Sequence, residues 1–161
     1  MRASRVWMLI RVLGIFATAV TSLAAAEAVL AASTRPKVVA YVPNWIDLES
    51  FSRTIPYEKV THLNVAFENP INDAGDLRYD ERYTGLLNEA HRHGVRVLVS
   101  IGGGAASDDA VLKPRYFSLI SEAKRADFAV KLTNYVVTHG FDGLDVDLEG
   151  PSINEDYGAF I

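Results

Sequence analysis

The ten residues FDGLDVDLEG, at positions 141–150, decide the fold. Apolar Leu144, Val146 and Leu148 alternate with acidic residues, and successive side chains of a β-strand point to opposite faces. The acidic residues of this alternation are Asp145, Asp147 and Glu149. The segment therefore predicts a strand whose apolar face packs under helices and whose other face carries three carboxylates in a row.

Three more short apolar runs precede this segment, at residues 38–42, 63–67 and 95–101. They are rich in β-branched residues, and the first and third are nearly continuous. Such runs are typical of buried parallel strands, which are covered on both faces.

Helix-like sequence separates the later strands. Apolar residues recur at helical spacing across 79–90 and again across 128–136, and Gly94 and Gly140 follow as natural helix stops. Strands that alternate with helices predict βαβ units, and hence an α/β fold built on a parallel sheet.

Polar, aromatic and glycine residues gather where each strand ends, at 43–45, 68–70, 102–104 and 149–151. Parallel α/β folds bind ligands at the carboxyl ends of their strands. We therefore expect a binding or active site at this edge of the sheet.

The row of carboxylates is the strongest chemical signal. Like charges this close cannot all ionise freely, so at least one carboxyl pKa is expected to be raised, as a general acid requires near neutral pH. A structural acidic cluster would also perturb pKa values, and that interpretation stays open. A calcium loop is disfavoured, because Glu149 and Asp156 occupy the positions where such loops carry Asp or Asn and Glu.

Two motifs in this order resemble those of glycoside hydrolase family 18, the chitinase family. The D-x-x-D-x-D-x-E pattern from Asp142 to Glu149 is similar to the signature that ends the family's fourth barrel strand. Ser100-Ile101-Gly102-Gly103 is similar to the S-x-G-G motif on its third strand. The resemblance covers about residues 37–161 and implies the first four βα units of a TIM (β/α)8 barrel.

The resemblance also implies roles for the acidic residues. Glu149 matches the proton donor to the glycosidic oxygen, and Asp147 matches the carboxylate that holds the N–H of the substrate's own acetamido group. Asp145 matches a buried partner that shares charge or a proton with Asp147. Asp142 has the wrong parity for the row, so it is expected to be structural, as is Gly143.

Residues at neighbouring strand ends complete the implied substrate site. Tyr41 and Phe67 match aromatic residues near the scissile sugar, and Trp45 is a candidate for stacking on a sugar ring. The remaining residues expected at the substrate are Ser100, Gly102 and Gly103. No G-x-S-x-G elbow surrounds the serine, so it is not expected to be a nucleophile.

The function implied by the resemblance is retaining cleavage of β-1,4-linked N-acetylglucosamine polymers, chitin or chito-oligosaccharides. The nucleophile would be the acetamido oxygen of the substrate, and we expect no cofactor and no metal. A non-catalytic, lectin-like sugar-binding barrel and an inactive truncated fragment are the alternatives. The acid at Glu149 favours the enzyme over the lectin.

Chain length stands against a complete barrel, which needs about 250 residues. The chain has 161 residues and stops soon after the fourth expected strand. We therefore expect a truncated domain with two bare sheet edges, through which copies could self-associate.

The first residues are expected to form a leader. Three arginines accompany an apolar run at 12–26, which ends in small residues and is shorter than a membrane span. This pattern predicts a signal peptide at 1–26, with cleavage between 26 and 32, and a catalytic domain at 33–161. The protein is then secreted or periplasmic, with no stable membrane anchor.

Composition restricts the partners further. The formal net charge is −4, and it becomes −7 when the leader's three arginines, and no acid, are removed. A chain this acidic offers no basic footprint for nucleic acid. It also contains no cysteine, which excludes disulfides and zinc–thiolate sites.

Overall fold

In the part of the chain that the structure describes, four parallel strands form one sheet in the order β1-β2-β3-β4. The computed structural model describes residues 36–161. Its strands are β1 (Val39–Pro43), β2 (His62–Ala66), β3 (Arg96–Gly102) and β4 (Gly143–Asp147). Each strand lies within one residue of an apolar run in the sequence, so the predicted α/β fold with a parallel sheet is confirmed.

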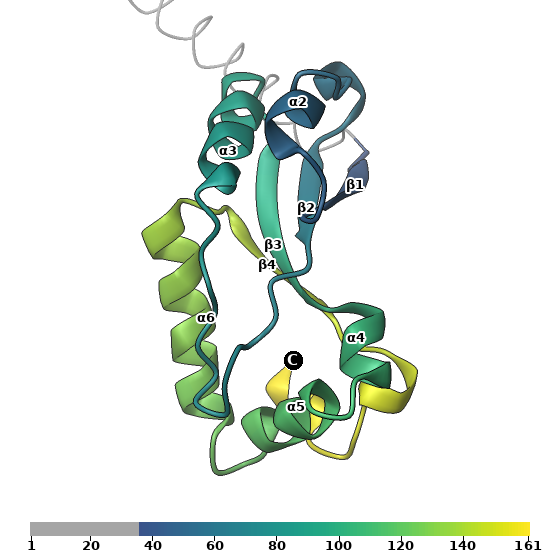
Figure 1. The fold of residues 1–161 in the computed structure, drawn as a ribbon, viewed down its shortest axis with the longest axis vertical. Helices are drawn as coiled ribbons and strands as arrows, with labels where there is room; N and C mark the ends of the chain where they lie inside the picture. The colour runs from purple at the N-terminus through teal and green to yellow at the C-terminus, as the bar shows by residue number, and fades with distance from the viewer. Residues whose placement is uncertain (1–35) are drawn as a thin grey trace, which may run out of the picture. The chain divides into compact units, whose positions relative to one another are not determined.

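Helices connect the strands. The two longest, α3 (Arg82–Arg92) and α6 (Arg125–His139), lie on the same side of the sheet (Figure 1). Gly94 follows α3 and Gly140 caps α6, both at positive φ, which glycine adopts without strain. The shorter helices are α2 (Leu48–Ser52), η1 (Tyr57–Lys59), α4 (Gly103–Asp108), α5 (Leu112–Ile120), η2 (Gly150–Ser152) and α7 (Tyr157–Phe160).

Helices α4 and α5 are not expected from the sequence. The three glycines at 102–104 predict a tight turn, but the turn is short and α4 already begins at Gly103. Helix α5 carries Pro114 in its first turn, where a missing backbone N–H is tolerated. Figure 1 shows both helices beyond the carboxyl end of β3, on the side of the expected site.

The parallel register aligns side chains in rows across the sheet. Ala66, Ser100 and Asp145 form one row, and Gly102 pairs with Asp147 in the next row along the strands. Paired residues point to the same face. We call the face that carries these residues the inner face, and the opposite face the outer face.

The outer face forms the core. Val65, Val97, Val99 and Ile101 are fully buried there, and they pack with apolar residues from the helices. Burial of each such side chain contributes about 1.5–3 kcal/mol. Leu144 of β4 contacts both groups of core residues and so joins them.

The prediction of buried strands is correct for β2 and β3 and wrong for β1, and the apolar face that the alternation predicts for β4 is only partly covered. Val39 of β1 is 50% exposed, and every residue of β4 is only half-buried. The reason is position, because β1 and β4 are the edge strands of the described sheet and each has a single neighbour. Self-association through these edges stays a prediction.

The predicted signal peptide, its cleavage region and the start of the domain at residue 33 lie outside the described residues. None of the helices within residues 36–161 has the length and apolar character that a membrane span requires.

Candidate active site

The acidic residues of β4 lie on the inner face. Asp145 and Asp147 are paired in register with Ser100 and Gly102 of β3. Glu149 lies two residues beyond the end of the strand. Its backbone is extended, and the residue is exposed. Because alternate residues of extended chain share a face, the strand carries its carboxylates toward one open side.

Asp145 is held in place by two hydroxyl groups. Its Oδ2 accepts hydrogen bonds from the Tyr41 hydroxyl at 2.9 Å and from Ser100 Oγ at 2.5 Å. Tyr41 comes from β1 and Ser100 from β3, so this carboxylate joins three of the four strands. Burial, followed by the nearby Asp145 charge, raises the pKa of the Tyr41 hydroxyl, which keeps it a hydrogen-bond donor.

Asp147 has a different environment. Burial raises the pKa of its carboxyl, and the negative charges of Glu149 and Asp145 raise it further. All three effects disfavour the ionised form. The row of carboxylates therefore contains a group that takes up a proton more readily than an ordinary aspartate.

The backbone of Glu149 is fixed from two sides, and the residue is exposed. Buried Ser152 accepts from the Glu149 N–H at 2.8 Å through Oγ and donates to the Glu149 carbonyl oxygen at 2.9 Å. Ser107 of α4 donates to the same carbonyl oxygen at 2.9 Å. Glu149 is thus an exposed residue on an anchored main chain.

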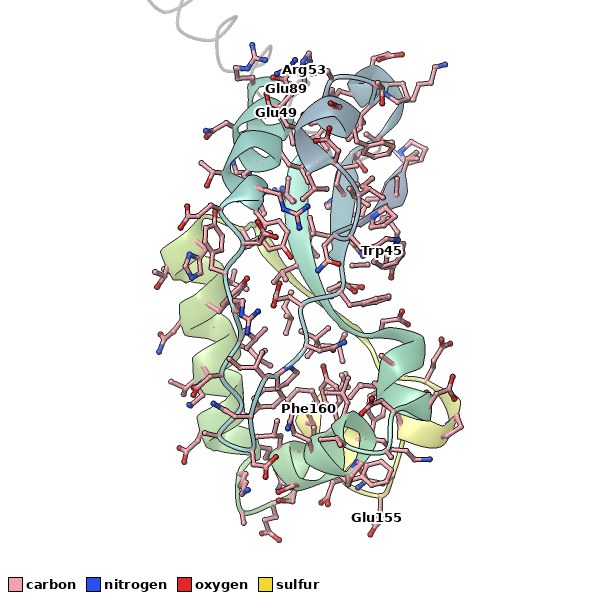
Figure 2. The ribbon with its side chains drawn as sticks, viewed as in Figure 1. Trp45, Glu49, Arg53, Glu89, Glu155 and Phe160 are labelled. Atoms are coloured by element: carbon pink, nitrogen blue, oxygen red, sulfur yellow. The ribbon has the colours of Figure 1, made fainter. Side chains whose placement is uncertain are left out.

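Three aromatic residues lie within or soon after the first two strands. The rings of Tyr41 and Phe67 lie 6.4 Å apart at an angle of 46°. Phe67 also covers Gly103, where an added Cβ would lie 2.5 Å from the ring. Trp45, in the loop after β1, is 72% exposed, and Figure 2 shows it projecting from the ribbon.

Ser100, Gly102 and Gly103 are all buried and act on the site through other residues. Ser100 donates to Asp145. Gly102 has φ +105 and a Cβ there would meet the Asp147 carbonyl oxygen at 2.3 Å, so only glycine lets β3 approach β4 here. Their contact with substrate stays a prediction.

Asp142 lies at the opposite end of β4 from Glu149. Its Oδ2 accepts from the Val97 N–H at 2.7 Å and lies 2.8 Å from His91 Nε2 of α3. Gly143 faces Leu98, with room for an ordinary van der Waals contact. Neither residue lies in the acidic row, and both contact neighbouring elements of the scaffold.

Sequence reasoning identified 68–70 only as a polar strand end and assigned no contacts to two groups of polar residues around the site. Asn69 bonds to both the N–H and the carbonyl oxygen of Gly102, and Tyr116 of α5 donates to it. Tyr83 of α3 donates to Glu68 at 2.7 Å. Burial raises the pKa of the Glu68 carboxyl. The sequence signal was slight, namely polar residues directly after β2.

Within the described part of the chain, no three histidine or acidic side chains converge in a way that could hold a metal ion.

Comparison with known proteins decides the family. A model of the family described as glycosyl hydrolases family 18 matches residues 37–161. The chain belongs to this family. The resemblance drawn from the two motifs is thereby confirmed.

The sequences of individual relatives support the same family assignment. The chain is 33% identical over 124 residues to a class V chitinase of Lotus japonicus, and 31% identical over 117 residues to a chitinase-like effector of Moniliophthora perniciosa. These alignments cover 73% and 70% of this chain but only 29% and 26% of the relatives. The chain thus spans little more than a quarter of their length.

Solved structures agree with the architecture. The family 18 chitinase ChiB of Flavobacterium johnsoniae has a TM-score of 0.69 and 28% identity, over 79% of this chain and 40% of that one. Catalytic domain 2 of an Ostrinia furnacalis group II chitinase, a mutant in complex with penta-N-acetylchitooctaose, has a TM-score of 0.55 and 26% identity. That match covers 68% of this chain and 31% of the other. The four βα units match part of the barrel of these family 18 structures, and the predicted partial TIM-barrel fold is confirmed.

Proposed function

We propose that the protein carrying this domain hydrolyses β-1,4-linked N-acetylglucosamine polymers with retention of configuration, and that Glu149 is the proton donor. The observation that carries the proposal is the row on β4. Glu149 is exposed on an anchored backbone, Asp147 next to it has a raised pKa, and Asp145 is held by two hydroxyl groups. The solved relative in complex with a chitin oligomer supports the substrate class.

The residues fit a substrate-assisted mechanism. Glu149 donates its proton to the glycosidic oxygen, and the bond from C1 to that oxygen breaks. The acetamido carbonyl oxygen of the same sugar attacks C1, while Asp147 accepts a hydrogen bond from the acetamido N–H. Water then attacks C1, the carboxylate of Glu149 takes up the proton of that water, and the acetamido group is restored. Two successive displacements at C1 retain its configuration.

Asp145 acts in this scheme through its neighbours. Its negative charge helps to raise the pKa of Asp147, and its bonds to Tyr41 and Ser100 prevent it from moving toward that residue. A positioned acid or base requires such support, because a small displacement of a reacting group can cost about 100-fold in rate.

Replacement of Glu149 by Gln tests the proton donor. We expect kcat on chito-oligosaccharides to fall about 10²- to 10⁴-fold, the usual contribution of general acid–base catalysis, with KM and thermal stability nearly unchanged. The matched control is Glu155→Gln, the same chemical change at another exposed glutamate, which Figure 2 shows away from Trp45.

Two outcomes would contradict the proposal in different ways. Equal turnover of Glu149→Gln and Glu155→Gln would remove Glu149 from the role of acid. A wild-type protein that binds the oligosaccharides without cleaving them would be a lectin-like member of the family instead.

We also propose that the protein is exported. Support comes from the basic start, the apolar run at 12–26 and the small residues that follow it. Mass spectrometry of the mature product tests this, since an N-terminus before residue 26 would contradict cleavage there.

A further inference from the structure

The main chain of the loop that carries Trp45 accepts two hydrogen bonds from one arginine side chain. Arg82, the first residue of α3, donates from Nη2 to the Asn44 carbonyl oxygen at 3.1 Å and from Nη1 to the Ile46 carbonyl oxygen at 3.0 Å. Asn44 and Ile46 are the residues directly before and after Trp45. One planar guanidinium therefore fixes the main chain on both sides of the exposed indole.

Arg82 is itself oriented. Its Nε lies 2.9 Å and 3.0 Å from the two carboxylate oxygens of Asp80, and its Nη2 lies 2.6 Å from one of them. The hydrogen bond from the Arg82 side chain lowers the pKa of the Asp80 carboxyl, which favours the charged form of the pair. With the guanidinium held in this orientation, Nη1 and Nη2 also donate to the loop carbonyl oxygens.

A second attachment joins the same loop to Phe67. The Asn44 side chain donates to the Phe67 carbonyl oxygen at 2.8 Å and to the Tyr83 hydroxyl at 3.0 Å, and Tyr83 donates onward to Glu68. The main-chain N–H of Asn44 bonds to Ala66 at 2.8 Å. Trp45 and Phe67 are therefore mounted on one connected frame.

Stability alone gives little reason for this frame to include Arg82. The Arg82 side chain is 50% exposed, and ion pairs exposed to this degree contribute little to folding. What the arginine does hold is the main chain around Trp45, a large residue with most of its surface in solvent. A rigid aromatic face costs less entropy to bind than a mobile one, because it is ordered before the ligand arrives.

We propose that Arg82 is a positioning residue that fixes Trp45 as a preformed stacking surface for one sugar ring of an N-acetylglucosamine oligomer. Asp80 orients Arg82, and the bond from Asn44 to Tyr83 aligns this surface with Phe67. The proposal rests on the proposed function for its ligand, but the immobility of the indole can be measured without any ligand.

The test uses the full chain with Trp7→Phe in every variant, so that Trp45 is the only tryptophan. Fluorescence anisotropy reports the local mobility of Trp45, and titration with tetra-N-acetylchitotetraose reports affinity. For Arg82→Ala we expect lower anisotropy and affinity reduced about 3- to 10-fold, the cost of ordering one side chain on binding. Arg82→Lys, which offers one donor point in place of a fork, is expected to fall between wild type and Arg82→Ala.

The matched control is Arg53→Ala. Arg53 is an exposed arginine directly after α2, and it forms an ion pair with Glu49 of that helix. Figure 2 shows this pair apart from Trp45. Both readouts are expected to equal those of the parent. If Arg82→Ala does not fold, Asp80→Asn removes the orienting charge and leaves the arginine in place.

Each other result overturns a defined part of the proposal. Arg82→Ala with the anisotropy of Arg53→Ala would show that the arginine does not immobilise the indole. Lower anisotropy with unchanged affinity would remove its role in sugar binding. A parent protein that binds no oligomer would overturn the proposed function and the stacking role together, whereas the anisotropy would still decide whether Arg82 holds the loop.

Discussion

Two neighbouring residues of β3 contrast the two faces of the sheet. Ser100 and Ile101 are both fully buried, with no exposed surface. Ile101 lies on the outer face among apolar residues, where burial itself is the stabilising interaction. Ser100 lies on the inner face and uses its burial to hold the carboxylate of Asp145.

The inner face is costly to fold. The pKa of Asp147 is raised by burial and by like charges, and the Asn64 side-chain oxygen is buried without a hydrogen-bond partner in the described part of the chain. Groups of this kind destabilise a fold, and they are retained where chemistry or binding requires them. The outer face supplies the stability that the inner face lacks.

The largest effect on stability is expected from Ile101→Ala. Loss of a fully buried side chain and the cavity left behind should reduce the free energy of unfolding by about 2–5 kcal/mol. Its neighbour gives the matched contrast, because Ser100→Ala removes one hydrogen bond to a charged group, worth about 1.5–3 kcal/mol. Chemical denaturation measures both.

Activity should show the reverse order at a temperature where both variants are folded. Ser100→Ala releases Asp145 on one side, so we expect kcat to fall about 10-fold, within the range that misplaced catalytic groups cause. Ile101→Ala should leave kcat near that of wild type. Equal losses of kcat would mean that the two faces are not functionally distinct.

The smaller effect concerns pH and Asp147. Its pKa in the folded protein lies above the ordinary value of 3.8, so folding favours the protonated form. The resulting penalty is absent below pH 3.8 and develops as pH rises through the folded-state pKa. Asp147→Asn, which cannot ionise, should therefore raise the melting temperature at pH 7 and lose this advantage at pH 3.

Melting curves at the two pH values measure the difference directly. A variant that is less stable than wild type at pH 7, or whose advantage grows in acid, would show that Asp147 is stabilised as an anion instead.

The sequence predicted the positions of the strands better than their burial or the short helix after β3. Alternation and β-branched runs mark the four strands, because these patterns depend on residues close together in the chain. Burial of β1 and β4 was overestimated, since a strand's position at a sheet edge depends on which other strands are present. Helix α4 was missed because the glycines that permit it also predict a turn.

The acidic row and its aromatic neighbours followed from strand periodicity and from a family motif. The contacts that hold these residues in place could not be predicted from the sequence. Tyr41 and Asp145 are separated by 104 residues, and Arg82 reaches Asn44 across 38. Such contacts are set by how elements pack, and no local pattern in the sequence encodes which carbonyl group an arginine will meet.

The most direct test of the central claim is the anomeric form of the first product. Time-resolved proton NMR of chito-oligosaccharide hydrolysis, with the protein that carries this domain, distinguishes the two anomers before they interconvert. The row on β4 and the acetamido nucleophile require the β-anomer to form first. Initial release of the α-anomer would mean direct attack by water, and it would contradict the substrate-assisted mechanism built on Glu149 and Asp147.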